Sequence, residues 1–241
     1  MKLLLTSSGI TNASIHHALV DLLGKPVEES NALIVPTAIY PFTQGPAGSY
    51  QMISGKTKSP FTQLGWKSLG VLELSVLPSI QKEIWIQAIQ ETDALLVWGG
   101  DPLFLSYWFS ESGLADILPS LEKLVYVGVS AGSMAVSGIF GETYQDSPAT
   151  SARPLTTQQI KFDTFEKTFI TAKGAGLINF AIIPHFNNEN HTDASMANAA
   201  IWASMLPVAV YAIDDNTAIK ITNNKVEIIS EGKWKLFNQT A

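Results

Sequence analysis

The feature that most constrains the fold is an alternation of short apolar runs with amphipathic stretches along the 241 residues. Several runs are apolar at every position, as expected for strands of a sheet that is covered on both faces. Alternating strand and helix favours right-handed βαβ units. The sequence therefore predicts a three-layer α/β fold, with a mostly parallel, doubly wound sheet and helices on both faces. The predicted strands are residues 2–6, 32–36, 71–77, 94–98, 125–129, 180–184 and 208–213.

Three stretches between these runs, residues 14–23, 80–89 and 194–205, show helical periodicity. In the second, Ile80, Ile84 and Ala88 recur on one face, and Trp85 and Ile89 widen it. This face is expected to pack on the sheet.

The other segments are interpreted from their turn residues. Residues 219–221 and 226–229 predict a closing β-hairpin, and the final EGKWKLF is expected to add an edge strand. Residues 40–60 and 141–157 are polar or rich in Pro and Gly, and are interpreted as surface loops, the first as a candidate lid. Because core-type strands continue on both sides of each loop, residues 1–241 are expected to form a single domain.

Charge and composition exclude several classes of protein. The net charge is −6, and the 15 Lys and Arg residues are scattered singly, so we expect no nucleic-acid partner. The absence of cysteine excludes disulfides, Cys-ligated zinc and a thiol nucleophile. The apolar run in MKLLLTSSG is too short for a signal peptide, and no run is long enough to cross a membrane. We therefore expect a cytoplasmic protein with no membrane partner.

The most informative motif is G-x-S-x-G at residues 128–132. An apolar strand precedes it and a helix-like AGSMAV follows, which is the context of a nucleophile elbow. A sharp strand-to-helix turn needs small residues beside the serine, and it exposes the hydroxyl of Ser130 above the strand end. The N–H of Ala131 would then point to where an oxyanion forms.

A serine hydroxyl needs a base, which is most often histidine. Of the four histidines, His185 directly follows the strand at 180–184, at a carboxyl end where open α/β sheets place their sites. His191 lies six residues further on and is the less favoured base, with a helix cap or a substrate contact as its other roles. If histidine is the base, activity is expected to fall at acid pH as the imidazole becomes protonated.

Two further strand ends carry polar or glycine residues. Asp214 and Asp215 follow the strand at 208–213, and normally only one of two adjacent acids can reach and orient the histidine. Gly99, Gly100 and Asp101 follow the strand at 94–98, where two glycines let a backbone N–H approach a ligand closely. This turn is a candidate second oxyanion donor.

Together these segments resemble the dipeptidase E and cyanophycinase family of serine peptidases. The similarity runs in order through the Gly99-Gly100-Asp101 turn, GVSAGSM around Ser130, GLINFAIIPHF and AIDDNTAIKI. The resemblance implies a class I glutamine amidotransferase-like fold, with serine instead of cysteine at the elbow. It also implies the chain order serine, histidine, acid, unlike the serine, acid, histidine order of α/β-hydrolases.

Carried over to this chain, the resemblance implies that Ser130 is the nucleophile and His185 the base. Asp215 stands where the family commonly has glutamate, and it is one methylene shorter. The N–H of Gly100 or Gly99, together with that of Ala131, would hold the oxyanion.

The family cleaves dipeptides with an N-terminal aspartate, or β-linked aspartyl-arginine, and either substrate needs a cation or several donors for its carboxylate. No Lys or Arg lies between His185 and Ile219, and Arg153 is the one arginine of the chain. Gly99, Asp101, Arg153 and His191 are the candidate substrate-binding residues. Arg153 could compensate an aspartate, but a preference for neutral or small N-terminal residues is slightly favoured.

The expected function is thus a serine hydrolase that cleaves small dipeptides, or aspartyl and isoaspartyl bonds, through an acyl-enzyme on Ser130. One alternative is a catalytically silent binding or regulatory member of the fold. Another is a general α/β-type esterase, which needs an acid between serine and histidine, such as Asp146 or Asp163. Four histidines without H-x-x-x-H or H-E-x-x-H spacing predict no metal site. No cofactor is expected, because acyl transfer needs none, and the expected partner is a small peptide substrate.

Overall fold

The structure, a computed structural model, describes residues 1–145 and 154–238. Its largest sheet is built from β1 (Lys2–Thr6), β2 (Asn31–Val35), β3 (Ser68–Val71), β4 (Ala94–Val97), β5 (Val125–Val129), β11 (Thr217–Thr222) and β12 (Lys225–Ser230). The order of these seven strands is β12-β11-β1-β5-β4-β2-β3. All pairs from β1 to β3 in this order are parallel, and the β1–β11 and β11–β12 pairs are antiparallel.

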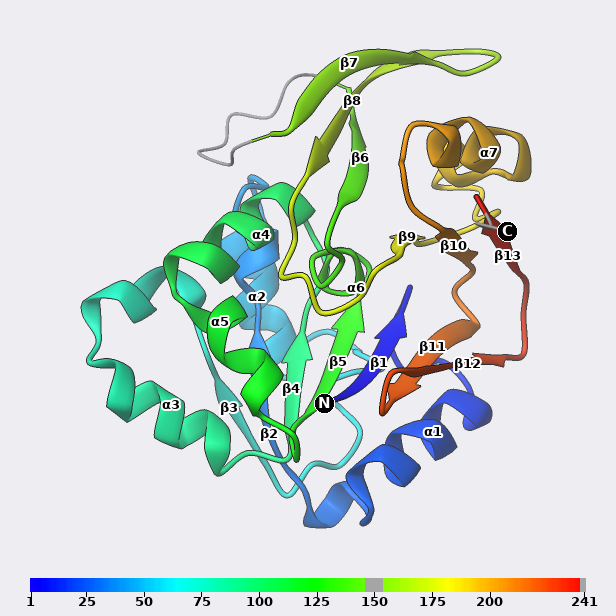
Figure 1. Cartoon of the computed structure of the whole chain (residues 1–241). Helices are drawn as coiled ribbons and strands as arrows, with labels where there is room; N and C mark the ends of the chain where they lie inside the picture. The colour runs from blue at the N-terminus through cyan, green and yellow to red at the C-terminus, as the bar shows by residue number, and fades with distance from the viewer. Residues whose placement is uncertain (146–153, 239–241) are drawn as a thin grey trace.

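Helices cover both faces of this sheet (Figure 1). They are α1 (Ala13–Leu23), α2 (Gly45–Ile53), α3 (Lys82–Gln90), α4 (Pro102–Glu111) and α5 (Leu114–Ile117). Because side chains alternate along a strand, Leu4 of β1 packs in a cluster with residues of α1, while Leu3 and Leu5 pack in another with residues of α3, α4 and α5. The predicted three-layer, mostly parallel α/β fold is confirmed.

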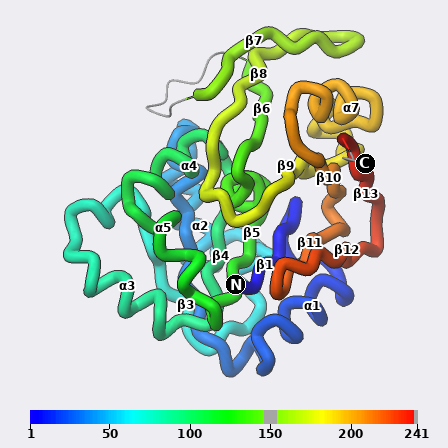
Figure 2. The backbone as a smooth tube through the Cα atoms, viewed as in Figure 1, coloured from blue at the N-terminus to red at the C-terminus, as the bar shows by residue number. Residues whose placement is uncertain are grey.

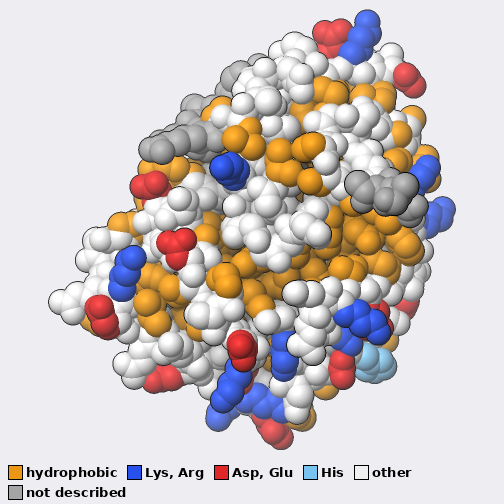
Figure 3. Space-filling view, in the orientation of Figure 1, with side chains coloured by type: hydrophobic (Ala, Val, Ile, Leu, Met, Phe, Trp, Pro, Cys, Tyr) orange, Lys and Arg blue, Asp and Glu red, His pale blue; other side chains and the backbone are white. Residues whose placement is uncertain are grey.

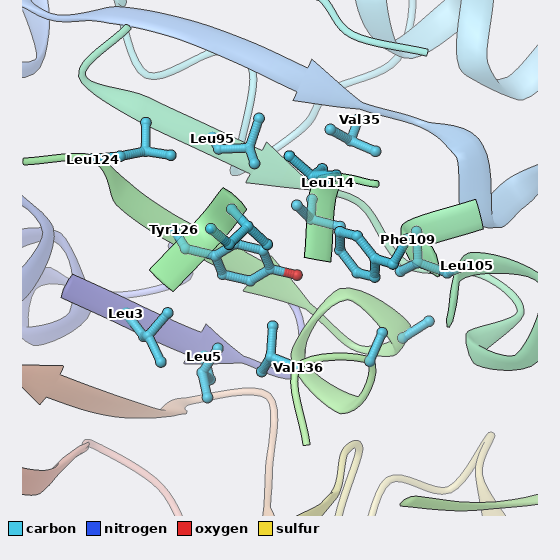
Figure 4. Packing of buried hydrophobic residues seen from close by; sticks show 14 of the residues in the cluster. Leu3, Leu5, Val35, Leu95, Leu105, Phe109, Leu114, Leu124, Tyr126 and Val136 are labelled. Atoms are coloured by element: carbon cyan, nitrogen blue, oxygen red, sulfur yellow. The ribbon is translucent and has the colours of Figure 1, made fainter. Parts of the chain in front are cut away.

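The second of these clusters surrounds β5 (Figure 4). Tyr126 of β5 is completely buried there, close to Phe109 and Leu105 of α4. Its hydroxyl donates a hydrogen bond of 2.6 Å to the carbonyl oxygen of Gly132, just after β5. Burial raises the pKa of the Tyr126 hydroxyl well above its ordinary value, so it stays a hydrogen-bond donor at any ordinary pH.

Two smaller sheets stand beside the large one (Figures 1 and 2). Their strands are β6 (Phe140–Tyr144), β7 (Thr156–Lys161), β8 (Glu166–Ala172), β9 (Ala181–Ile183), β10 (Val210–Ile213) and β13 (Trp234–Phe237), in the orders β6-β8-β7 and β13-β10-β9. The β7–β8 hairpin reaches away from the large sheet. A further cluster, including Phe140, Phe169 and Trp202 of α7 (Met196–Ser204), packs these sheets together.

Most predicted strands and helices are confirmed to within about two residues. The closing hairpin is β11 and β12, and the EGKWKLF segment forms β13, which pairs with β10 as an edge strand. The strands predicted at 180–184 and 208–213 are β9 and β10, but they lie in their own sheet instead of the large one.

The strand predicted at residues 71–77 is wrong. β3 ends at Val71, and residues 74–79 form a 3₁₀ helix. The Glu73 side chain accepts the N–H of Ser75 at 3.1 Å, which caps this turn, and Pro78 has no N–H for a sheet ladder.

The two predicted loops contain regular structure. Residues 45–53 are helical, because Pro46 stands in the first turn, where proline is tolerated and no N–H is needed. Residues 140–144 form β6 and residues 156 and 157 begin β7, both paired with β8. Neither pairing could be seen in the sequence, because β8 was itself not predicted.

The prediction that the face with Ile80 and Ile84 packs on the sheet is also wrong. Trp85 and Ile89 are buried, but Ile84 is 60% exposed and Ile80 is 37% exposed. Helix α3 lies at the margin of the molecule (Figure 1), so only a narrow stripe of it reaches the core.

The surface carries interspersed charges. On the face shown in Figure 3, the Lys side chains of the described residues lie apart or beside acidic ones and form no basic stripe. Within residues 1–145 and 154–238, no helix has the length and apolar character needed to cross a bilayer.

Candidate active site

Ser130 occupies a sharp turn between β5 and α6 (Ala131–Met134). Its backbone has φ 50° and ψ −112°, a conformation that costs a non-glycine residue about 1–3 kcal/mol. The turn is tied to β1: the N–H of Ser130 donates to the carbonyl of Thr6 at 2.9 Å, and the Ser133 hydroxyl donates to the same oxygen at 2.7 Å. These contacts hold the strained turn in place.

Gly132 explains why the turn needs a small residue two positions after the serine. A Cβ at this position would lie 2.2 Å from the carbonyl oxygen of Val97, at the end of β4. No side chain fits at that distance, so only glycine lets the turn rest against the neighbouring strand.

His185 lies just beyond β9, also with a positive φ of 56°. Its N–H donates to the Ser7 hydroxyl oxygen at 3.1 Å, and that hydroxyl donates to the carbonyl of Ile213 at 2.7 Å. The N–H of Phe186 donates to the same carbonyl at 3.0 Å. The backbone at His185 is thereby fixed between the ends of β1 and β10.

The structure brings Ser130, His185 and Asp215 into one line of hydrogen bonds. The Nε2 atom of His185 is 3.0 Å from Oγ of Ser130, and its Nδ1 atom is 2.7 Å from Oδ1 of Asp215. Asp215 also accepts hydrogen bonds from the Ser8 hydroxyl at 2.7 Å and from the Asn188 amide at 2.6 Å. This arrangement can move a proton from the serine to the histidine and stabilise the resulting imidazolium.

The hydrogen bond from His185 lowers the pKa of Asp215 well below its ordinary value, against the opposing effect of burial, and Ser8 and Asn188 lower it further. Asp215 is therefore ionised throughout the neutral range. Because the folded pKa is depressed, the stabilisation that it provides is present above its unfolded pKa, near 4, and is lost as the pH falls toward the folded pKa.

Asp214 faces a different set of groups. Its Oδ1 accepts the Asn216 N–H at 3.1 Å and the Thr217 hydroxyl at 2.7 Å, and its Oδ2 accepts the N–H of Lys233. Of the two adjacent acids, Asp215 is the one that reaches His185.

Three consecutive residues at the end of β1 contact all three members of this line. The carbonyl of Thr6 binds the N–H of Ser130, the Ser7 hydroxyl binds the N–H of His185, and the Ser8 hydroxyl binds Asp215. These roles were not predicted from the sequence, although a Thr-Ser-Ser run at the end of a predicted strand could have indicated polar contacts there. Asn188 was missed because nothing in the sequence marks it.

His191 packs flat against the base. Its ring is stacked on that of His185, with centroids 4.2 Å apart and planes 14° from parallel. Burial lowers the pKa of His191, and the positive charge of a protonated His185 lowers it further, which favours the neutral ring. His191 thus lies against one face of the His185 ring and also lines the cavity described below.

The predicted oxyanion donors lie beside the serine. Gly100 has φ 141°, and a Cβ there would lie 2.2 Å from the carbonyl oxygen of Ala38. A Cβ at Gly99 would lie 3.2 Å from Cβ of Ser130. In the described part of the chain, the N–H groups of Gly100 and Ala131 have no hydrogen-bond acceptor, so both are available to a ligand.

Asp101 has a structural role that the sequence analysis did not anticipate. Its carboxylate caps α4 by accepting the Phe104 N–H at 3.0 Å, and it accepts the Tyr144 hydroxyl at 3.1 Å. Burial raises the pKa of Tyr144, which keeps its hydroxyl protonated as a donor.

Of Asp146, Arg153 and Asp163, the structure describes Asp163 alone. Arg153 and Asp146 lie outside the described residues. Asp163 lies in the exposed turn between β7 and β8 and makes no hydrogen bond to His185. For the residues that the structure describes, no cluster of His, Asp and Glu could hold a metal ion.

A cavity of about 450 Å³ opens beside Ser130 and His185. Its walls include the Gly100–Pro102 turn, strand β6 with Glu142 and Tyr144, Lys167 of β8, and the segment that carries His191 and Asp193. Glu142 had no sequence signal, because its strand was interpreted as a loop, and Asp193 was not singled out from the sequence. The cavity has room for a small peptide next to the serine.

Comparison with known proteins shows which family the chain belongs to. The sequence model of Peptidase family S51 matches residues 3–229, nearly the whole chain. The chain belongs to peptidase family S51. As a member of this dipeptidase E family, it is a serine peptidase. No curated protein matches the chain.

Solved structures agree with this S51 assignment at the level of the fold. A peptidase E candidate from Listeria monocytogenes EGD-e has a TM-score of 0.62 at 21% identity, over 96% of this chain and 98% of its own. A peptidase from an acI-B1 Actinobacterium has a TM-score of 0.62 at 16% identity, over 97% of this chain and 88% of its own.

Proposed function

We propose that this S51 peptidase hydrolyses small peptides through an acyl-enzyme on Ser130. The hydrogen-bonded line from Ser130 through His185 to Asp215 is the observation that carries the proposal. His185 accepts the proton of the Ser130 hydroxyl through Nε2, while the oxygen attacks the carbonyl carbon of the scissile bond. Asp215 orients the ring and stabilises the imidazolium.

The oxyanion that forms in this step needs donors. Ala131 directly follows the serine, and Gly100 lines the same cavity as Ser130. The N–H groups of both are unused in the described part of the chain, and we assign them this role. His185 then gives its proton to the departing amine. In the second half of the reaction, His185 deprotonates a water molecule that attacks the ester carbon, and the proton returns to Ser130.

The cavity supports a neutral residue more than an aspartate on the acyl side. Lys167 is the only Lys or Arg among its described lining residues, and its ammonium group is 2.6 Å from the carboxylate of Asp193. That Arg153 balances the negative charge of a substrate aspartate stays a prediction. If it does, Arg153→Met would selectively depress the hydrolysis of Asp-X dipeptides.

Two alternatives from the sequence have less support. The esterase alternative needs an acid between Ser130 and His185 in the chain, but the hydrogen-bond partner of His185 is Asp215, which follows it. A catalytically silent binding protein would not require a serine hydrogen-bonded in line with a histidine and an acid.

Labelling with a fluorophosphonate probe tests the proposal. The probe should modify the purified protein at Ser130, and a panel of Ala-X, Gly-X, Asp-X and β-aspartyl dipeptides should include at least one that slows labelling and is hydrolysed. A protein that is folded but neither labels nor cleaves any dipeptide would instead be the silent member of the fold.

The acid gives a separate prediction. Asp215→Asn is expected to lower kcat by about 10⁴-fold, because the amide would hold the His185 ring in the wrong tautomer for accepting the serine proton. The control is Asp214→Asn, since the Asp214 carboxylate is hydrogen-bonded to Asn216 and Thr217 and not to His185, and its loss should affect stability more than kcat. Steady-state kinetics with thermal unfolding of both variants makes the comparison. A larger loss of kcat in Asp214→Asn would reassign the acid.

A further inference from the structure

The cavity beside Ser130 has acidic walls. Three carboxyl side chains line it, those of Asp101, Glu142 and Asp193, against the single ammonium group of Lys167 among the described lining residues. Because carboxyl groups outnumber ammonium groups there, the cavity favours a cationic ligand over an anionic one.

Two of the three carboxyl groups are already engaged by the protein. Asp101 accepts hydrogen bonds from the first turn of α4 and from the Tyr144 hydroxyl at 3.1 Å. Asp193 is 2.6 Å from Nζ of Lys167, and it also accepts the Thr143 hydroxyl. Neither carboxylate needs a ligand to balance it.

Glu142 is different. It lies in β6, on the same side of the strand as Tyr144, since side chains two apart share a face. Its Oε1 accepts the N–H of Thr143 at 2.7 Å, and this is the one hydrogen bond of its carboxyl group within residues 1–145 and 154–238. The other oxygen, Oε2, is left to bind a ligand in the cavity.

The surroundings of Glu142 make its charge depend on what the cavity holds. Burial raises the pKa of Glu142 to about 8, and the charges of Asp193 and Asp101 add to this, while the Thr143 N–H and Lys167 oppose it. The raised pKa favours the protonated form of this carboxyl group at neutral pH. A cation placed against it favours the ionised form, so binding of a cation would release a proton.

Building on the proposed function, we propose that Glu142 binds a cationic group of the substrate residue on the acyl side of the scissile bond. That group is an ammonium, either the free α-amino group or a basic side chain. The protein would then select its substrates by a positive charge near the reacting carbonyl, and the carboxylate of an N-terminal aspartate would face the acidic wall.

Glu142→Gln tests this, because it keeps the acceptor for Thr143 and removes the charge. Two peptide pairs separate the two ammonium sources: Lys-Ala against norleucyl-Ala for the side chain, and Ala-Ala against N-acetyl-Ala-Ala for the α-amino group. In the wild type, kcat/KM should favour the cationic member of at least one pair by about 10- to 150-fold, the range of a charge-assisted hydrogen bond. The preference should vanish in Glu142→Gln.

The matched control is Glu166→Gln, which removes the same charge from an exposed site on β8. It should keep the wild-type preference. A wild-type enzyme that favours neither cationic peptide, or a preference that survives Glu142→Gln, would overturn the inference. Fluorophosphonate labelling of Ser130 in the same samples keeps the two proposals apart: labelled protein that cleaves peptides without charge preference contradicts only the role of Glu142.

A second measurement tests the role of Glu142 even if the Glu142→Gln protein does not fold. Calorimetry of Lys-Ala and norleucyl-Ala binding to the Ser130→Ala protein, in buffers of different ionisation enthalpy at neutral pH, gives the protons released. For a side-chain contact, Lys-Ala should release more protons than norleucyl-Ala. For an α-amino contact, Ala-Ala should release protons that N-acetyl-Ala-Ala does not. Equal release within both pairs would refute the inference.

Discussion

Replacing Ser130 by alanine is expected to abolish peptide hydrolysis while leaving the fold intact. The loss in kcat should be on the order of 10⁶-fold, because the proposed acyl-enzyme forms on this hydroxyl. Only one small hydroxyl is removed, and its partner, the His185 ring, is still held by Asp215. Steady-state kinetics on the best dipeptide, with circular dichroism and thermal unfolding, measures both parts.

Ser137→Ala is a matched control, since Ser137 is a buried serine near the same turn whose hydroxyl has no hydrogen-bond partner within the described residues. It should keep full activity. Peptide hydrolysis that continues undiminished in Ser130→Ala would remove the serine from the mechanism altogether.

His185→Ala should cost about as much as Ser130→Ala, because the base and the nucleophile act as one unit. Combining the two changes should therefore add little to either loss. His191→Ala should cost far less, since its ring stacks on that of His185, which is the ring hydrogen-bonded to Ser130. The rates of the three variants on one substrate give the ranking, and the reverse ranking of the two histidines would make His191 the base.

The central sheet could be predicted because its strands are apolar on both faces and are separated by periodic helices. Strands β1 and β5 match their predicted ranges residue for residue. The β6-β8-β7 sheet could not be predicted, since a strand such as β7, with the sequence TTQQIK, is polar and mostly exposed. It is held in place by its hairpin pairing with β8, and polar residues in such a hairpin show no apolar pattern in the sequence.

Some residues of the candidate site could likewise be predicted from the sequence, and others could not. Ser130, His185 and Asp215 each follow a strong apolar strand, so their meeting at the strand ends could be expected. Glu142 could not be found, because its strand was read as a loop and because its unusual environment depends on Asp101 and Asp193, which are distant in sequence.

The Thr6-Ser7-Ser8 run at the end of β1 also has a consequence for the maturation of the enzyme. Its partners His185 and Asp215 lie 178 and 207 residues further along the chain. Such long-range contacts form late in folding, because the intervening chain must first be ordered. A newly made chain would carry its reactive serine with no base beside it until the C-terminal strands dock. Hydrolytic competence therefore arises only once the C-terminal part of the chain has folded against β1.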